Sequence, residues 1–213
     1  MGVRSKIAVY GVICILFIMW GCGGTSPRFA GRTKKSTTTE SKTPHGPRFS
    51  SKEAEEESKE NDVKLDTKEI DRINNGERDF RKEKNSAIRP LEQSKMMREI
   101  SKYMGVSYLL GGASTAGMDC SGYTMTVYKN ALGKQLPRSS AEQSTVGIPI
   151  RLSDLKFGDL IFFNTTGEHA SHVGIYLGDD LFAHASVSLG VTISSLQSSY
   201  YAKRFERAQR IIE

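Results

Sequence analysis

Apolar side chains are distributed unevenly along the 213 residues, and this distribution limits where the chain can fold. They are sparse between about residues 24 and 92 and dense in residues 93–213. A domain of roughly 120 residues buries about two-thirds of its unfolded surface, which is enough for an independent core. We therefore expect one folded domain at 93–213.

The net charge of +6 is not concentrated in this predicted domain. Residues 94–213 contain 12 Lys and Arg against 10 Asp and Glu, which leaves +2. This part of the sequence has no basic cluster interleaved with aromatic residues, the pattern typical of a nucleic-acid-binding face. We expect no nucleic-acid partner.

Residues 1–21 are typical of a bacterial secretory signal peptide. Two positive charges precede 14 uncharged residues at 7–20, whereas a helix needs about 20 apolar residues to span a bilayer. Gly21 and Cys22 then resemble the site at which lipoproteins are cleaved and lipidated, although Trp20 stands where a small residue is usual. We expect lipidation at Cys22, with an uncleaved signal anchor as the alternative.

The residue after this cysteine bears on the expected location. Gly23, and not an aspartate, follows Cys22. In an envelope with two membranes this resembles the pattern of lipoproteins sent to the outer membrane. We therefore expect a protein of the cell envelope, lipid-anchored in the outer membrane and facing the periplasm.

Residues 22–92 are predicted to form a lipidated N-terminus followed by a charged, flexible tether. The segment is rich in Gly, Ser, Thr, Pro and Lys and then in Glu. Such a composition buries too little apolar surface to offset the entropy lost on ordering. A short helix is compatible with the sequence between Asp62 and Asn74, where Asn75 and Gly76 would end it.

Within the predicted domain, helical periodicity comes first and short apolar runs follow. The predicted helices span 91–104, 121–132 and 140–146, with capping-box spacing between Ser140 and Gln143 in the last. The predicted strands span 159–163, 172–177, 181–185 and 191–193, with a hairpin turn at 178–180. Helices followed by an antiparallel sheet indicate the α+β class.

Cys120 is a candidate nucleophile. Cys14 would be removed with the signal peptide and Cys22 would carry lipid, so Cys120 has no disulfide partner within the mature chain. It lies where a loop meets a helix, and the positive end of the helix dipole favours the reactive thiolate. Its own N–H, unpaired at the helix start, is suited to bind a developing oxyanion. The structural alternative is a small buried core residue.

Two strand histidines strengthen the catalytic interpretation. If the strands joined by the 178–180 turn pair with positions summing to 358, His184 lies opposite residue 174 and shares a face with His172. A base oriented by a further polar group is what nucleophilic catalysis requires. His169 in the preceding loop is the rival base. Structural zinc is disfavoured because no C-x-x-C pair occurs, and we expect no metal and no other cofactor.

Six short segments and the single residue Gln143, in order and spacing, resemble the NlpC family of cell-wall cysteine peptidases, most closely its lipoprotein branch. They are residues 108–112 (YLLGG), 119–122 (DCSG), 136–139 (LPRS) with Gln143, 158–163 (GDLIFF), 172–178 (HVGIYLG) and 184–186 (HAS). The resemblance covers Ser94 to Glu213 and implies a circularly permuted papain-like fold, in which N-terminal helices pack on an antiparallel sheet.

The resemblance also implies roles for individual residues and a substrate. These are Cys120 as nucleophile, His172 as general base and acid, His184 as the residue orienting His172, and Tyr108, Asp119 and Ser121 as oxyanion or substrate contacts. For Tyr108 the alternative is a core aromatic, and for Arg138 we expect support of the structure or of a peptide carboxylate. The implied reaction is hydrolysis of amide bonds in peptidoglycan stems or crosslinks. A non-catalytic peptidoglycan-binding lipoprotein, or an amidase or acyltransferase on the same fold, remain the alternatives.

Overall fold

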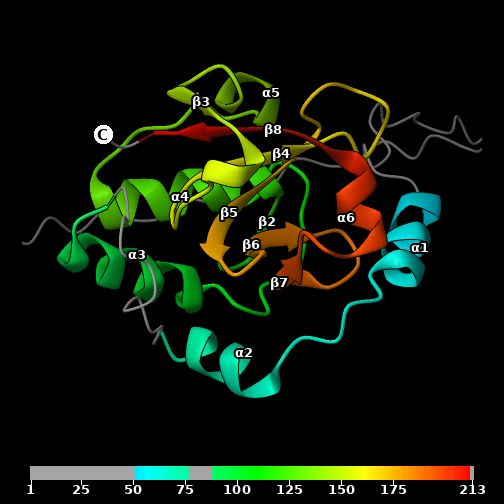
Figure 1. The fold of residues 1–213 in the computed structure, drawn as a ribbon, viewed down its shortest axis with the longest axis horizontal. Helices are drawn as coiled ribbons and strands as arrows, with labels where there is room; N and C mark the ends of the chain where they lie inside the picture. The colour runs from blue at the N-terminus through cyan, green and yellow to red at the C-terminus, as the bar shows by residue number, and fades with distance from the viewer. Residues whose placement is uncertain (1–50, 77–87, 212–213) are drawn as a thin grey trace, which may run out of the picture. The chain divides into compact units, whose positions relative to one another are not determined.

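A computed structural model describes residues 51–76 and 88–211 of the chain. The predicted signal peptide and Cys22 lie outside these described residues. The helices are α1 (Ser51–Glu60), α2 (Thr67–Asn74), α3 (Pro90–Lys102), α4 (Cys120–Leu132), α5 (Ser140–Gln143) and α6 (Ser199–Arg204) (Figure 1). The strands are β1 (Ala113–Ser114), β2 (Gly117–Met118), β3 (Ile148–Ile150), β4 (Leu160–Phe163), β5 (His172–Gly178), β6 (Leu181–Ser186), β7 (Gly190–Ser195) and β8 (Phe205–Arg210).

Six of these strands form one antiparallel sheet in the order β3-β8-β4-β5-β6-β7. The four strands predicted from apolar runs are β4 to β7, and the three predicted helices are α3, α4 and α5. The α+β class is therefore confirmed. The sequence did not reveal β3, β8 or α6.

The sheet is covered on both faces by apolar side chains. Along β4, Leu160 and Phe162 join the core that includes residues of α3 and α4, whereas Ile161 and Phe163 join a second core with residues of α6. Because side chains alternate along a strand, a strand buried on both faces shows a continuous apolar run. This explains why the apolar run at 159–163 predicts β4.

The predicted register of the central hairpin is confirmed. Ile175 pairs with Ala183 and Tyr176 with Phe182, and both pairs sum to 358. The turn itself uses Asp179 and Asp180 in the left-handed region, with φ of 51° and 59°. The register therefore places His172 and His184 on one face of the sheet, as expected.

The ends of α4 and α5 follow capping chemistry. Gly133 ends α4 with a φ of +67°, a conformation that glycine adopts without the penalty of a Cβ atom. The predicted capping box of α5 was wrong by one position, because Ser139 and Glu142 form it. Gln143 is instead buried, and its Nε2 donates to the carbonyl oxygens of Pro137 and of Ser121 in α4.

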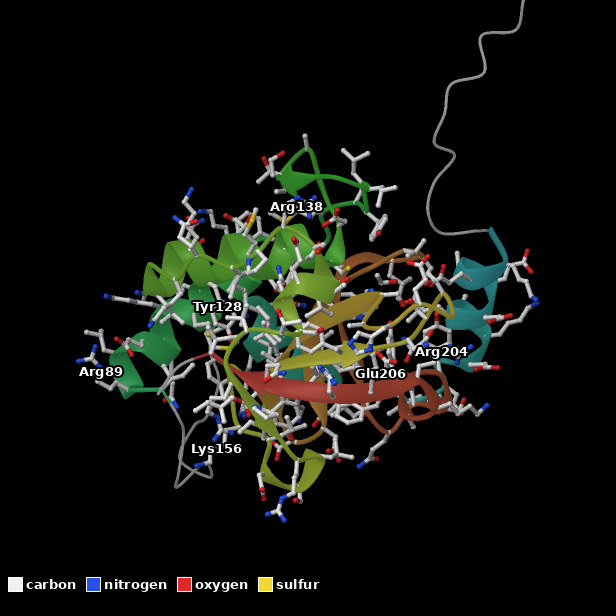
Figure 2. All side chains as sticks on the ribbon, turned by 90° about the horizontal axis from the view of Figure 1, so that it is seen from above. Arg89, Tyr128, Arg138, Lys156, Arg204 and Glu206 are labelled. Carbon is white, nitrogen blue, oxygen red and sulfur yellow. The ribbon has the colours of Figure 1, made fainter. Side chains whose placement is uncertain are left out.

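Residues 51–76, within the segment expected to be a tether, contain two helices, and α2 lies inside the 62–74 span where the sequence is compatible with a short helix. Both helices in this segment pack against the domain, with Ile73 of α2 fully buried in the main core. Arg204 of α6 forms ion pairs with Glu56 and Glu60 of α1 (Figure 2). The free energy gained from these contacts offsets the entropy lost when the segment becomes ordered, which its few apolar residues alone could not offset.

No helix within 51–76 or 88–211 is long and apolar enough to cross a bilayer.

Candidate active site

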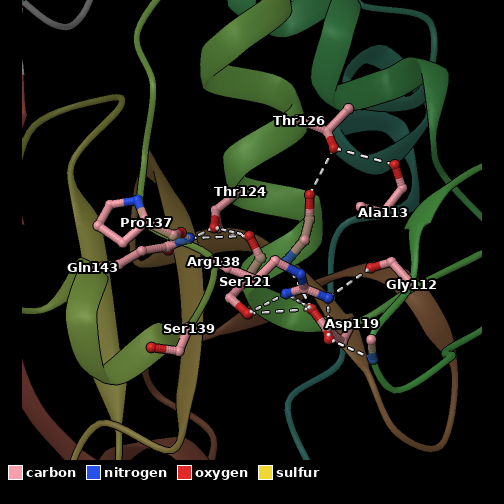
Figure 3. A network of polar contacts seen from close by, with 12 residues as sticks. Gly112, Ala113, Asp119, Ser121, Thr124, Thr126, Pro137, Arg138, Ser139 and Gln143 are labelled. Atoms are coloured by element: carbon pink, nitrogen blue, oxygen red, sulfur yellow. Dashed lines mark hydrogen bonds and ion pairs between the residues drawn. The ribbon is translucent and has the colours of Figure 1, made fainter.

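The start of α4 is fixed by a dense polar network around the residue before Cys120. Asp119 is the N-cap, and its Oδ1 accepts a bond of 2.7 Å from the Gly122 N–H. Its Oδ2 accepts bonds from the Gly111 N–H and from Arg138, each 2.7 Å long (Figure 3). The network joins the loop before α4 to the loop after it and thereby fixes the position of Cys120.

The electrostatics of this network favour an ionised aspartate. Burial raises the pKa of Asp119. The hydrogen bonds from Arg138, Gly122 and Gly111 lower it by more, so the pKa of Asp119 lies below its usual value. Ser121 lies in the same network, since its hydroxyl donates to Asp119 and accepts from Arg138. Arg138 therefore supports the structure, as the sequence led us to expect.

The first turn of α4 also depends on a glycine. A Cβ atom at Gly122 would lie 2.2 Å from the carbonyl oxygen of Gly112. We expect Gly122→Ala to lower the free energy of unfolding by about 2 to 3 kcal/mol, because a backbone contact cannot yield as a flexible side chain does. Thermal unfolding measures this. Gly105→Ala is the control: its Cβ would meet nothing within 4 Å, so only strain at positive φ, about 1 kcal/mol, is expected. Equal stability of Gly122→Ala and wild type would contradict the tight approach.

Cys120 is the first residue of α4 and is buried. It shares the main core with Val173, the residue after His172 on β5. Burial raises the pKa of Cys120 to about 12, the charge of Asp119 raises it as well, and the main chain of Val173 lowers it. The expected preference for thiolate at a helix start is therefore outweighed, and the resting thiol keeps its proton.

His172 and His184 form a hydrogen-bonded pair. His172 Nε2 lies 2.9 Å from His184 Nδ1, and both imidazoles are buried. Burial lowers the pKa of His172 to about 4, although the charges of Glu57 and Asp119 raise it. Burial likewise lowers the pKa of His184 well below its usual value. The pair is neutral at rest, and Nδ1 of His172 is left for another partner.

The second nitrogen of His184 binds two hydroxyl groups that the sequence analysis missed. His184 Nε2 lies 3.0 Å from Ser194 Oγ on β7 and 3.4 Å from Tyr201 Oη on α6. No local motif marks these residues, because a β7 serine and an α6 tyrosine meet His184 only through the sheet and helix packing. His184 pairs with Thr192 of β7 in the sheet, and Ser194 lies two residues further along β7, on the same face of the sheet.

A pocket lies beside His172, between the sheet and α1. Glu53 and Glu57 of α1, Thr165 and Tyr201 are among its lining residues. Burial raises the pKa of Glu53 to about 7, although a hydrogen bond with Thr165 lowers it. The segment predicted as tether therefore contributes two acidic side chains next to the histidine pair.

The remaining predicted residues have different surroundings. Tyr108 is partly buried and packs against the main core, which fits the core alternative; its role in substrate contact stays a prediction. His169 is exposed, and its Nδ1 lies 3.2 Å from a carboxylate oxygen of Glu206 of β8, so the rival histidine contacts Glu206 and not His184. Among residues 51–76 and 88–211, no three His, Cys, Asp or Glu side chains gather as metal ligands.

The fold and the site together define a class of protein. A cysteine begins a helix that packs on an antiparallel sheet, and a hydrogen-bonded histidine pair lies on that sheet, as in permuted papain-like folds. The profile of the NlpC/P60 family matches residues 105–210. The chain belongs to this family.

Relatives of known name agree with this assignment. The chain is 38% identical over 146 residues to the probable endopeptidase NlpC homolog of Haemophilus influenzae, which covers 66% of this chain and 78% of that protein. It is 41% identical over 120 residues to the murein DD-endopeptidase MepS/murein LD-carboxypeptidase of Escherichia coli K12. That match covers 56% of this chain and only 63% of the relative's length.

Solved structures show the same fold. The chain is similar to the crystal structure of an NlpC/P60 family protein from Bacillus cereus, with a TM-score of 0.54 and 31% identity. The likeness covers 61% of this chain and 43% of that one. The fold implied by the resemblance of these sequence segments is thereby confirmed.

Proposed function

We propose that the protein is a peptidoglycan endopeptidase that hydrolyses amide bonds in cell-wall peptide stems or crosslinks, with Cys120 as nucleophile. One observation carries the proposal: His172, whose Nε2 is bound to His184, precedes Val173 on β5, and Val173 lies in the same core as Cys120. The names of the Escherichia coli and Haemophilus influenzae relatives support the substrate class and the reaction.

In the first half of the reaction, His172 acts as base. Its Nε2 is occupied by His184, so Nδ1 accepts the proton of the Cys120 thiol as the sulfur attacks the amide carbon. The carbonyl oxygen gains negative charge, and the N–H of Cys120 at the start of α4 is suited to stabilise it. Because burial keeps the thiol protonated at rest, proton transfer accompanies attack on bound substrate.

In the second half, the proton goes to the leaving group. His172 donates it from Nδ1 to the amine as the carbon–nitrogen bond breaks, which leaves an acyl group on the Cys120 sulfur. Water then attacks the thioester carbon, and His172 takes one proton from the water. The carbon–sulfur bond breaks, the carboxylic acid leaves, and His172 returns the proton to the Cys120 sulfur. Atoms balance with water as the only co-reactant.

Digestion of purified peptidoglycan by the full chain in mild detergent tests the proposal. We expect soluble fragments, and their masses, read by mass spectrometry, identify the cleaved bond as one within a stem or one at a crosslink. No fragments from a folded protein that still sediments with the sacculi would contradict the proposal and favour a binding lipoprotein.

We further propose that Cys22 carries the lipid that anchors the protein in the outer membrane, facing the periplasm. The uncharged run at 7–20 and the Gly21–Cys22 site support this. Because α1 begins at residue 51, residues 23–50 alone separate the anchor from the folded part, and even fully extended they would span at most about 100 Å. The enzyme's reach is accordingly shorter than a tether ending at residue 92 would give.

Metabolic labelling tests the anchor. In cells given a labelled fatty acid, we expect the wild-type chain to carry label and to fractionate with membranes. Cys22→Ser is expected to lose the label entirely, because serine offers no thiol for the thioether. Cys14→Ser is the control and keeps the label. Equal labelling of Cys22→Ser and wild type would contradict lipidation at this site.

A further inference from the structure

We propose that Glu57 of α1 is a positioning residue that fixes the hydrogen-bond direction of the His184–His172 pair through Tyr201. The proposal rests on the proposed catalytic function of that pair. Glu57 lies outside residues 105–210, the segment that matches the family profile. The chain would thus complete its active site with a side chain supplied by the segment before the family domain.

The carboxylate reaches the histidines through one hydroxyl group. Tyr201 Oη donates to Glu57 Oε1 over 2.5 Å, and the same oxygen lies 3.4 Å from His184 Nε2. His184 Nδ1 in turn lies 2.9 Å from His172 Nε2. All four side chains are buried, so water does not compete for these bonds.

Glu57 is held firmly at this position. Its second oxygen, Oε2, accepts bonds from the N–H and the hydroxyl of Ser188, at 3.4 and 3.0 Å. The segment after α1 also contributes, because Asn61 Nδ2 donates to Ser194 Oγ over 3.3 Å. Both hydroxyl partners of His184 Nε2 are therefore contacted from residues 57–61.

The carboxylate imposes a direction on the whole series of bonds. Its oxygens only accept, so Tyr201 must donate to Glu57 and present oxygen lone pairs to His184. His184 then carries its proton on Nε2 and accepts at Nδ1 from the Nε2–H of His172. His172 is left with an unprotonated Nδ1, which is the form that can take a proton from Cys120.

The charge of Glu57 acts in the same sense. It raises the pKa of His172 against the effect of burial, and Asp119 at the start of α4 adds to it. The other titratable groups around His172 are His184 on β6 and Tyr201 on α6, whose rings contact its ring, and Glu53 of α1 and Tyr200 of α6, which line the same pocket. The imidazolium formed during attack is therefore stabilised from α1.

Variants at Glu57 separate the two effects. Glu57→Gln keeps an acceptor oxygen and loses the charge, whereas Glu57→Leu loses both. With soluble crosslinked muropeptides and the full chain, we expect kcat to fall about tenfold for the first and about 100-fold for the second, with KM little changed. Tyr201→Phe is expected to match Glu57→Leu, and the double variant to be no slower than either single one.

Two glutamates of α1 provide matched controls. Glu55→Gln removes the same charge from an exposed side chain that forms an ion pair with Lys59 of the same helix. Glu56→Gln weakens the contact with Arg204 and so tests docking of the helix alone. The kcat of both variants is expected to stay within about twofold of the wild-type kcat, because ion pairs of solvent-exposed side chains contribute little free energy.

A pH profile adds a readout that a structural role alone would not move. Without the charge of Glu57 the pKa of His172 falls, so the limb of the profile set by His172 is expected to shift to lower pH by about 0.5 unit in Glu57→Gln. Wild-type kcat and an unshifted limb in Glu57→Gln would overturn the proposal. A faster Glu57→Gln would also overturn it, and would show that α1 obstructs the substrate.

Nuclear magnetic resonance of the ring nitrogens keeps the proposal separate from the proposed function. In the wild-type chain at neutral pH, we expect both His172 and His184 to carry their proton on Nε2. This result supports the proposal even if no peptidoglycan is cleaved. A proton on Nδ1 of His172 would refute it even if cleavage is efficient.

Discussion

Replacing Cys120 by alanine is expected to reduce the rate of peptidoglycan hydrolysis by at least about 10⁴-fold, because it removes the thiol on which the acyl intermediate forms. The change removes one buried sulfur at the first position of α4 and leaves the Asp119 cap in place. The fold is therefore expected to survive, with a loss in unfolding free energy of about 1 kcal/mol.

Fragment release from sacculi, followed over time by chromatography, measures this effect. Thermal unfolding and sedimentation with sacculi show in parallel that the variant is folded and still binds. Cys120→Ser is a useful second variant, since it keeps the shape but offers a far weaker nucleophile, and it should be nearly as slow. Hydrolysis by Cys120→Ala within tenfold of wild type would show that another group carries the chemistry.

Replacing Arg138 by methionine is expected to cost about 2 to 4 kcal/mol of unfolding free energy. The change leaves the Asp119 carboxylate, whose side chain is only 8% exposed, without its cationic partner. The effect should depend on pH. Because the folded-state pKa of Asp119 is lowered, its stabilisation is complete above the unfolded value of about 3.9 and is lost as pH falls through the folded value. The difference in unfolding free energy between the wild type and Arg138→Met should therefore become smaller at acidic pH.

Denaturant unfolding at neutral and acidic pH tests this expectation. Arg151→Met is the matched control, because Arg151 pairs with Asp154 at an exposed site, and its loss should cost about 0.5 kcal/mol or less. Equal losses of unfolding free energy in Arg138→Met and Arg151→Met would mean that the Asp119 network does not hold the start of α4. A loss in Arg138→Met that does not change with pH would mean the same.

The parts of the site that could be predicted are those governed by local rules. The β5–β6 register follows from two apolar runs and a short turn, and it placed His172 and His184 together correctly. The start of α4 at Cys120 and its end at Gly133 follow from capping chemistry. In both cases residues close in sequence determine the geometry.

The missed parts depend on contacts between distant residues. α1 is densely charged and buries little apolar surface, so polar contacts such as its ion pairs with Arg204 and the bonds of Glu57 to Tyr201 and Ser188 explain why it is ordered. β8 is polar in sequence, yet it lies between β3 and β4, and its Arg210 pairs with the buried Asp159. Neither pairing leaves a periodic signal in the sequence. The buried state of the Cys120 thiol has the same origin, since it depends on packing against β5.

The most direct test of the central claim is digestion of peptidoglycan in water labelled with heavy oxygen, with the wild-type chain beside Cys120→Ala. Hydrolysis through a thioester on Cys120 predicts that each newly formed carboxyl group in the wild-type digest carries one heavy oxygen atom and that the variant yields no fragments. Fragments without the label would indicate transfer to another acceptor. Labelled fragments in equal amounts from both proteins would contradict the role assigned to Cys120.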